Sequence, residues 1–202
     1  MRIAFKEWQI VVEALGRGEQ ILILRKGGLS EGQGGFKVEH DRFLLFPTLF
    51  HQQRESVVPS AQARFDEIAS SFPAPDCVRI GFFCEVALVQ RLDSLASAER
   101  LRGQHIWRDE VIAERFDWGR GKNIQVLAVR VFRLPKAVEL PRLDSYGGCR
   151  SWVQIEREID ASGAVPVLSN TAFARKLTEV WEALEMTQVS RTTAESVGVM
   201  DS

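Results

Sequence analysis

The sequence predicts an α+β protein, a small, mixed, mostly antiparallel β-barrel with helices at its ends. Three observations lead to this fold class. The apolar segments are short, they alternate irregularly with helical patterns, and no glycine-rich turn of the nucleotide-binding type joins a strand to a helix. With 202 residues, 45% hydrophobic and 26% charged, the chain suits one domain, which we place at residues 1–185.

The chain opens with an amphipathic pattern. Apolar residues recur at helical spacing over residues 5–15, which predicts a helix that ends at Gly16 and Gly18. Residues 21–24 are all apolar and predict a short buried strand. The glycines of residues 27–35 predict a loop.

Two further strands and a helix follow in the middle of the chain. The segment FLLFPTLF at 43–50 predicts a strand that Pro47 ends or confines to an edge. Ser60 is placed to cap a helix over residues 61–71. Residues 78–90 predict a strand, and Gly81 within it predicts a bulge or a barrel corner.

The next elements are two short helices and a long strand. Residues 94–104 and 106–117 predict the helices, and the GRGK segment at 119–122 predicts a turn. Residues 124–134 are rich in β-branched side chains and are mostly apolar on both faces. A strand of this kind is expected in the centre of a sheet.

The C-terminal part contains less regular structure. The prolines that bracket residues 135–141 predict a short extended piece, and residues 152–155 predict a last strand. Residues 170–185 predict a final helix with Asn170 as its cap. Residues 186–202 are polar and predict a disordered tail.

The charge is unevenly distributed although the net value is only −1. Residues 91–150 carry 12 Lys and Arg against 8 Asp and Glu, whereas residues 151–202 carry 4 against 8. Arginine dominates the cations, and its planar fork suits phosphate groups and base edges. Codon bias explains the arginine excess equally well, so only the local positive segment favours a polyanionic partner.

Several classes of protein are disfavoured by what the sequence lacks. No apolar run approaches the ~20 residues that span a bilayer, and Lys6 and Glu7 interrupt any signal-peptide pattern. We therefore expect a cytoplasmic protein without a membrane partner. The three cysteines and three histidines show no metal-ligand spacing, so we expect no disulfide framework, no metal and no cofactor. Protein partners and oligomeric state are left open.

Three segments together resemble an uncharacterised bacterial family that is catalogued only as a domain of unknown function. They are AFKEWQIVVEALGRGEQILILRKGG, FLLFPTLFHQ and YGGCRSW, and the likeness covers roughly residues 4–185. A weaker likeness is to the PUA-like superfamily, in its ASCH and EVE branches. ASCH domains carry G-x-K-x-x-E-x-R on the first strand, which Gly18 and Arg25 match, while Gln20 and Ile23 replace the Lys and the Glu.

The PUA-like resemblance implies a β-barrel whose cleft binds RNA or a modified nucleobase. Some ASCH relatives hydrolyse small amides, and the losses at Gln20 and Ile23 count against such an activity here. The resemblance therefore favours a binding module over an enzyme.

Cations that lie close to aromatic residues or to glycines are the candidate contacts for nucleic acid. Each candidate has an alternative interpretation, as a solvated strand end, a packed core residue or a plain turn. The predicted contacts are Lys6, Arg25, Lys26, Arg115, Trp118, Tyr146 and Arg150.

We therefore expect a non-catalytic module that binds RNA, DNA or a nucleotide. The rival hypothesis is a metal-dependent nuclease or phosphodiesterase that uses Glu7, Glu39 and Lys26 around a metal. A third hypothesis is a structural domain that binds a protein partner and whose cations are merely solvated.

Overall fold

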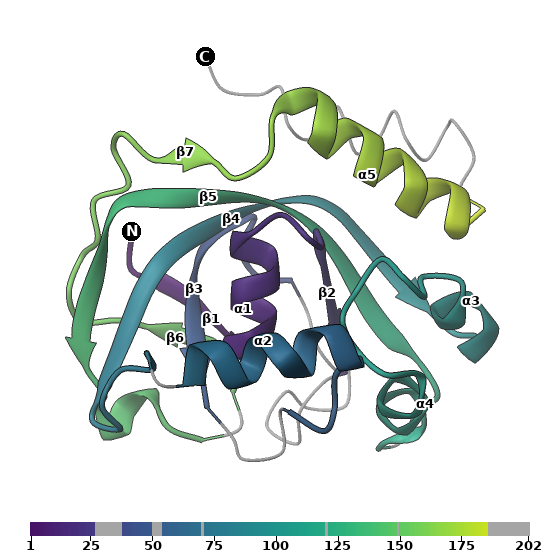
Figure 1. Ribbon diagram of the computed structural model, residues 1–202, viewed down its shortest axis with the longest axis horizontal. Coiled ribbons are helices and arrows are strands. Elements are labelled where there is room, and N and C mark those ends of the chain that lie inside the picture. The colour runs from purple at the N-terminus through teal and green to yellow at the C-terminus, as the bar shows by residue number, and fades with distance from the viewer. Residues whose placement is uncertain (27–37, 50–53, 70, 120, 149, 186–202) are drawn as a thin grey trace.

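A computed structural model of the chain describes residues 1–26, 38–49, 54–69, 71–119, 121–148 and 150–185. Within these ranges one curved sheet encloses a helix, and further helices cover its open side and its outer face (Figure 1). The predicted loop at 27–35, His51, Arg120, Cys149 and the predicted tail lie outside the described residues.

The strands of the sheet follow the order β2-β5-β4-β3-β1-β6, and β7 pairs with β5 off this path. All described strand pairs are antiparallel except β1 with β3, which is parallel. The α+β class and the mixed, mostly antiparallel sheet are thus confirmed, whereas the order describes an open path and no closed barrel. The strands are β1 (Ile3–Trp8), β2 (Leu22–Arg25), β3 (Arg42–Thr48), β4 (Cys77–Leu92), β5 (Ile124–Pro141), β6 (Trp152–Gln154) and β7 (Val165–Pro166).

Five α-helices and one 3-10 turn are described. Figure 1 shows α1 beneath the arch that β4 and β5 form, α2 across the open side, α3 and α4 at one end, and α5 on the outer side of β5. The α-helices are α1 (Gln9–Gly16), α2 (Pro59–Ala69), α3 (Leu95–Glu99), α4 (Asp109–Asp117) and α5 (Asn170–Ala183), and the 3-10 turn is Asp144–Tyr146.

The prediction of a helix from residue 5 is wrong at its start. Residues 5–8 belong to strand β1, which pairs with β3 on one side and with β6 on the other. Backbone pairing on both sides satisfies the N–H and C=O groups of β1, and this overrides the helical spacing of Phe5 and Trp8. The helix begins only at Gln9, so Trp8 lies at the junction of strand and helix.

The two long strands β4 and β5 form the arch, and their irregularities lie where glycine and proline predict them. The register shifts between Ile80 and Phe82, which brackets Gly81, so the predicted bulge is confirmed. The predicted extended piece is the end of β5, which continues through Pro135 to Pro141. Strand β5 lies between β2 and β4, which confirms its central position.

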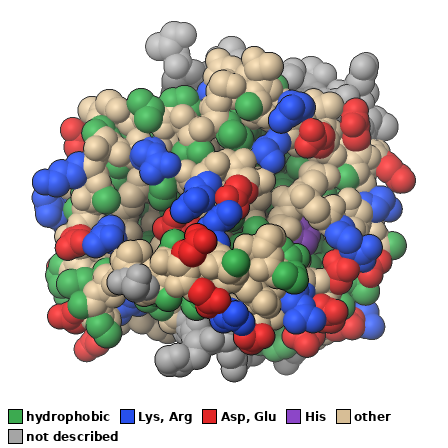
Figure 2. All heavy atoms as spheres, in the orientation of Figure 1, with side chains coloured by type: hydrophobic (Ala, Val, Ile, Leu, Met, Phe, Trp, Pro, Cys, Tyr) green, Lys and Arg blue, Asp and Glu red, His purple; other side chains and the backbone are tan. Residues whose placement is uncertain are grey.

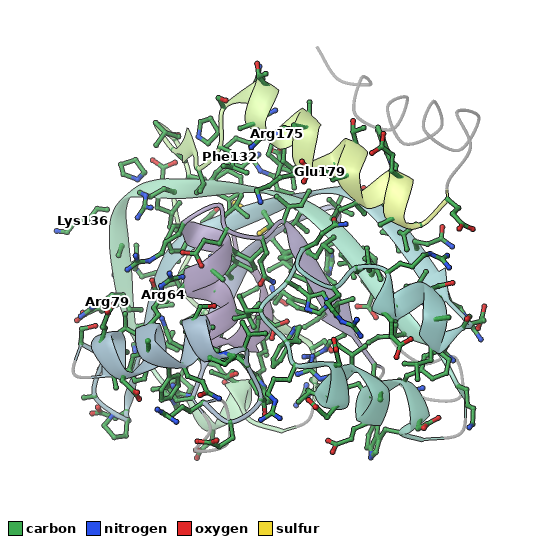
Figure 3. The ribbon with its side chains drawn as sticks, turned by 45° about the vertical axis from the view of Figure 1, so that its right-hand side comes forward. Arg64, Arg79, Phe132, Lys136, Arg175 and Glu179 are labelled. Atoms are coloured by element: carbon green, nitrogen blue, oxygen red, sulfur yellow. The ribbon has the colours of Figure 1, made fainter. Side chains whose placement is uncertain are left out.

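The helix boundaries differ from the predictions by a few residues. Helix α3 is much shorter than residues 94–104, and α2 begins before Ser60. In α5 the cap is Ser169, whose hydroxyl accepts a hydrogen bond from the backbone N–H of Ala172 at 3.2 Å, and not Asn170. Figure 3 shows Arg175 and Glu179 on this helix, where they form an i, i+4 ion pair, and Lys136 pointing outward from the bend of β5.

Two apolar clusters fill the fold. The larger one joins α1, β2, β5 and α4 beneath the arch, and the smaller one lies between β3, β4 and the 146–159 segment. Gly18 makes the turn from α1 toward β2 with a φ of +69°, where a side chain would also meet Leu168. None of the helices in the described ranges combines the length and apolar character that crossing a bilayer takes.

Candidate functional site

The two end strands of the sheet meet through side chains. Arg25 is the last residue of β2, and its Nε and Nη2 donate hydrogen bonds to the hydroxyl of Ser151 at 3.2 and 3.0 Å. Ser151 directly precedes β6, at the other end of the strand order. The guanidinium of Arg25 also lies 5.3 Å from the ring centre of Phe5 on β1. Arg25 therefore connects the end of β2 with β1 and with the residue that precedes β6.

A second arginine comes to the same place from helix α4. Arg115 donates a hydrogen bond from Nη1 to the carbonyl of Leu24 at 3.2 Å, one residue before Arg25. Its guanidinium lies 3.7 Å from the ring centre of Trp107 and 5.3 Å from that of Trp8. The two indoles contact each other edge to face at 4.8 Å. Arg115 is thus held against aromatic rings, and no acid of the described residues forms an ion pair with it.

Glu7 lies behind Arg115 and is 1% exposed. Its Oε1 accepts a hydrogen bond from the backbone N–H of Trp8 at 2.7 Å, while its Oε2 is buried without a hydrogen-bond partner. We call Glu7, Trp8, Arg25, Trp107 and Arg115 the arginine–tryptophan cluster.

Burial dominates the electrostatics of this cluster. It lowers the pKa of Arg115 to about 10, with Glu7 opposing the shift and Arg25 adding to it. Arg115 is still protonated near neutral pH, so two positive charges lie side by side. Neither Arg25 nor Arg115 forms an ion pair with an acidic side chain of the described residues.

Lys6 stands between Phe5 and Glu7 on β1, so its side chain points to the opposite face of the strand from these two residues. The ammonium of Lys6 donates to the carbonyls of Gly147 and Gly148, both at 3.1 Å. Arg150 is exposed and directly precedes Ser151. The structure therefore brings two of the seven predicted contacts, Arg25 and Arg115, to one place.

Lys26 is directed elsewhere, as alternation along a strand requires. Its ammonium donates to the carbonyls of Phe116, Gly121 and Asn123, which occupies all three of its N–H groups. Burial lowers the pKa of Lys26, with Arg91 adding to the effect. Lys26 holds the connection between α4 and β5 and does not join Arg25.

The two predicted stacking residues lie in different surroundings. Tyr146 is buried against Phe46, with ring centres 5.7 Å apart, and its hydroxyl accepts a hydrogen bond from the backbone N–H of Glu156. Trp118 follows the last residue of α4 and is 49% exposed. Tyr146 therefore presents no free face, whereas Trp118 does.

Sequence reasoning assigned no binding role to Trp107 and Ser151 and placed Trp8 in the core. Trp107 is separated from Trp8 by about half the chain, and backbone bonds between residues 106–108 and 56–58 bring its segment into place. For Ser151, the neighbouring Arg150 indicated that the segment could bind an anion, but nothing in the sequence indicated a role for the serine hydroxyl.

A metal site is not evident in the described part of the chain. No group of three or more His, Cys, Asp or Glu side chains with the geometry to hold a metal ion occurs there. Of the three residues in the nuclease hypothesis, Glu7 is buried, Glu39 is exposed and Lys26 binds backbone carbonyls.

Comparison with known families identifies the chain. A family model described as "Domain of unknown function (DUF1802)" matches residues 4–179. The chain belongs to the DUF1802 family. The predicted membership in a family of this kind is thereby confirmed, and the DUF1802 match contains every residue of the arginine–tryptophan cluster and Ser151. No curated protein matches the sequence significantly.

Solved structures similar to this DUF1802 chain include an ASCH protein from Zymomonas mobilis and its variants. The S128A variant superposes with a TM-score of 0.44 at 8% identity and covers 88% of this chain and 94% of its own. The unsubstituted ASCH protein gives 0.43 at 10% identity, with 87% and 92% covered.

Proposed function

We propose that this domain binds single-stranded nucleic acid or a nucleotide, without catalysing a reaction, through Arg25 and Arg115. The observation that carries the proposal is that these two arginines lie together next to indole rings, with no ion pair to an acid among the described residues. Guanidinium groups bind phosphate oxygens, and aromatic rings beside them stack with bases. Arg150, which is exposed and directly precedes Ser151, adds a positive charge near this pair.

Arginines elsewhere on the surface differ from Arg25 and Arg115 because acidic side chains pair with them. Figure 2 shows one face of the molecule, on which Lys and Arg side chains are interspersed with Asp and Glu. Arg54, Arg79 and Arg102, for example, are each within 2.8 Å of an acidic oxygen. Such arginines have their charge neutralised locally, so the unpaired arginines are the better anion contacts.

Glu7 has a supporting role in this proposal. A buried anion favours the protonated form of Arg115, which burial alone would disfavour. The partner would contact Arg25, Arg115 and Trp8, which are half-buried, while Glu7 stays behind them.

The test measures fluorescence anisotropy of a labelled single-stranded RNA and of the same sequence as DNA, at low and high salt. We expect Arg25→Ala to weaken binding about tenfold and to reduce the dependence of affinity on salt, because one phosphate contact is lost. Arg79→Ala is the matched control, since it removes an exposed arginine that is paired with Glu139. Absence of binding at low salt, or equal losses in both variants, would contradict the proposal.

A further inference from the structure

Trp107, whose ring Arg115 covers, also lines a cavity of about 540 Å³ that Arg115 does not line. The turn before β2, the start of α2 and the 102–110 segment surround it. Its volume is within the range of small-molecule sites, ~300–1,000 Å³. The residues that matter here are Ser60, Trp107, His105, Asp109 and Glu110, all of which line it.

His105 is the unusual residue of this wall, because it is a polar side chain that is only 7% exposed. Its Nδ1 accepts a hydrogen bond from the backbone N–H of Trp107 at 3.2 Å. A neutral imidazole whose Nδ1 is an acceptor carries its proton on Nε2. Among the described residues Nε2 makes no hydrogen bond, and it is not one of the fully enclosed side-chain atoms. The donor of this largely buried ring is therefore open to the cavity that His105 lines.

The starts of two helices lie at the same wall. Helix α2 begins at Pro59 and contributes Ser60, and α4 begins at Asp109 and has no side-chain cap at Arg108. The first N–H groups of a helix lack acceptors within the helix, and its N-terminus carries partial positive charge. Both features favour an oxygen acceptor in the cavity.

The three acidic side chains on the wall are each compensated by an arginine. Glu19 pairs with Arg64. Asp109 pairs with Arg102 at 2.8 Å, and Glu110 with Arg108 at 3.2 Å. The charge of these acids is therefore balanced, and the wall carries no uncompensated carboxylate among the described residues.

We propose that this cavity binds a small molecule through a carboxylate or phosphate oxygen, which accepts the hydrogen bond from Nε2 of His105. Val58 and Ile106 on the wall would contact the apolar part of such a molecule. The proposal is independent of nucleic-acid binding, because it uses neither Arg25 nor Arg115.

The first experiment follows the imidazole signals of the intact protein by ¹H–¹⁵N NMR. The chain has only 3 histidines, so the His105 signals are assigned by their loss in His105→Asn. We expect the Nε2–H tautomer near neutral pH. We also expect inorganic phosphate, uridine monophosphate or succinate to shift the Nε2–H signal. An Nδ1–H tautomer, or no shift with any probe at millimolar concentration, overturns the proposal.

Two substitutions separate ligand binding from folding. Asparagine places an acceptor near the Nδ1 position and can keep the bond from Trp107, but it lacks the donor at Nε2. Glutamine places an N–H donor near Nε2. We therefore expect His105→Asn to weaken binding of the responding probe at least tenfold and His105→Gln to keep it within about threefold.

The remaining outcomes are also decisive. Equal affinity of wild type and His105→Asn overturns the proposal. The proposal also fails if uridine binds with the same affinity as uridine monophosphate while phosphate and succinate give no response. Which of the phosphate and carboxylate probes responds identifies the acid group. RNA binding in the anisotropy assay is expected to be unchanged in His105→Asn, so failure here leaves the proposed function standing.

Discussion

The arginines of this protein fall into two environments, and α2 and the arginine–tryptophan cluster show them best. On α2, Asp66 accepts two hydrogen bonds from Arg54, both at 2.8 Å, at the surface, where the two side chains are 40% and 54% exposed. These bonds raise the pKa of Arg54 and lower that of Asp66. In the cluster, burial lowers the pKa of Arg115 instead, and its neighbours are indoles and a backbone carbonyl. The same side chain is therefore a surface ion-pair partner in one place and a desolvated cation in the other.

The difference shows that the number of hydrogen bonds an arginine makes is a poor guide to its contribution to folding. Arg54 makes more hydrogen bonds with acids than Arg115, yet exposed ion pairs contribute little to folding because water and salt screen them. Arg115 covers two aromatic faces and satisfies the Leu24 carbonyl. Substitutions in both places can confirm or break this comparison.

The largest effect is expected for Arg115→Ala. The change removes a desolvated cation–π contact, worth up to about 2 kcal/mol, and leaves the Leu24 carbonyl without its donor, a loss of about 1–3 kcal/mol. We expect the free energy of unfolding to fall by roughly 2–4 kcal/mol in urea denaturation. Arg115→Lys, which keeps the charge without the planar face, should recover part of the loss. A variant as stable as the wild type would show that Arg115 does not brace the cluster.

The second effect is a dependence of stability on pH through His105, which lines the same cavity as Trp107. Burial lowers the pKa of His105 to about 4, Arg115 adds to the shift, and Asp109 and the Trp107 backbone oppose it. The unfolded chain then binds more protons than the folded one between about pH 4 and the ordinary histidine pKa of about 6.5. Stability should therefore fall as the pH is lowered through this window, by on the order of 3 kcal/mol at its end.

Chemical denaturation at several pH values measures this loss, and His105→Gln provides the control because it cannot titrate. The difference in unfolding free energy between wild type and variant should change only within the window. A difference that is constant with pH, or an NMR titration of His105 near 6.5, would show that the imidazole is more open to water than the structure indicates.

A smaller effect is expected for Ser151→Ala. Its hydroxyl is 2% exposed and accepts two hydrogen bonds from Arg25, so the substitution should cost about 1–2 kcal/mol. Urea denaturation measures the loss, and Arg25→Ala should show little additional loss in a Ser151→Ala background, since the two residues share the bond. Additive losses would mean that the bond contributes nothing.

The smallest effect is expected for Arg54→Ala. Its partners are exposed, so the melting temperature should change by no more than the error of a thermal scan. A shift as large as that of Ser151→Ala would remove the distinction between the two arginine environments.

The sequence was informative wherever a strand carries its own pattern. The apolar faces of β5 predicted a central strand, and Gly81 predicted a bulge, because both depend on residues near in sequence. Strand β1 was mistaken for a helix because Phe5 and Trp8 fit helical spacing. Only pairing with β3 and β6, from distant parts of the chain, decides its conformation.

The candidate site was predictable in part for the same reason. Arg25 and Arg115 could be selected as arginines near aromatic residues or glycines. Their proximity, however, depends on α4 packing against β2, which no local pattern encodes. Lys26 failed to join them because neighbours in a strand face opposite ways. Trp107 could not be anticipated, since its partners Trp8 and Arg115 come from separate elements.

The hydrogen bonds between Arg25 and Ser151 have a consequence for the tendency of the protein to aggregate at high concentration. Unpaired strand edges invite other chains to add a strand, which leads to aggregation. Here the two end strands of the main path, β2 and β6, are only 4 and 3 residues long, and a side-chain bond joins their ends. Little backbone is left at either end as a template for a neighbouring molecule. A loss of this bond would therefore be felt first as self-association at high concentration.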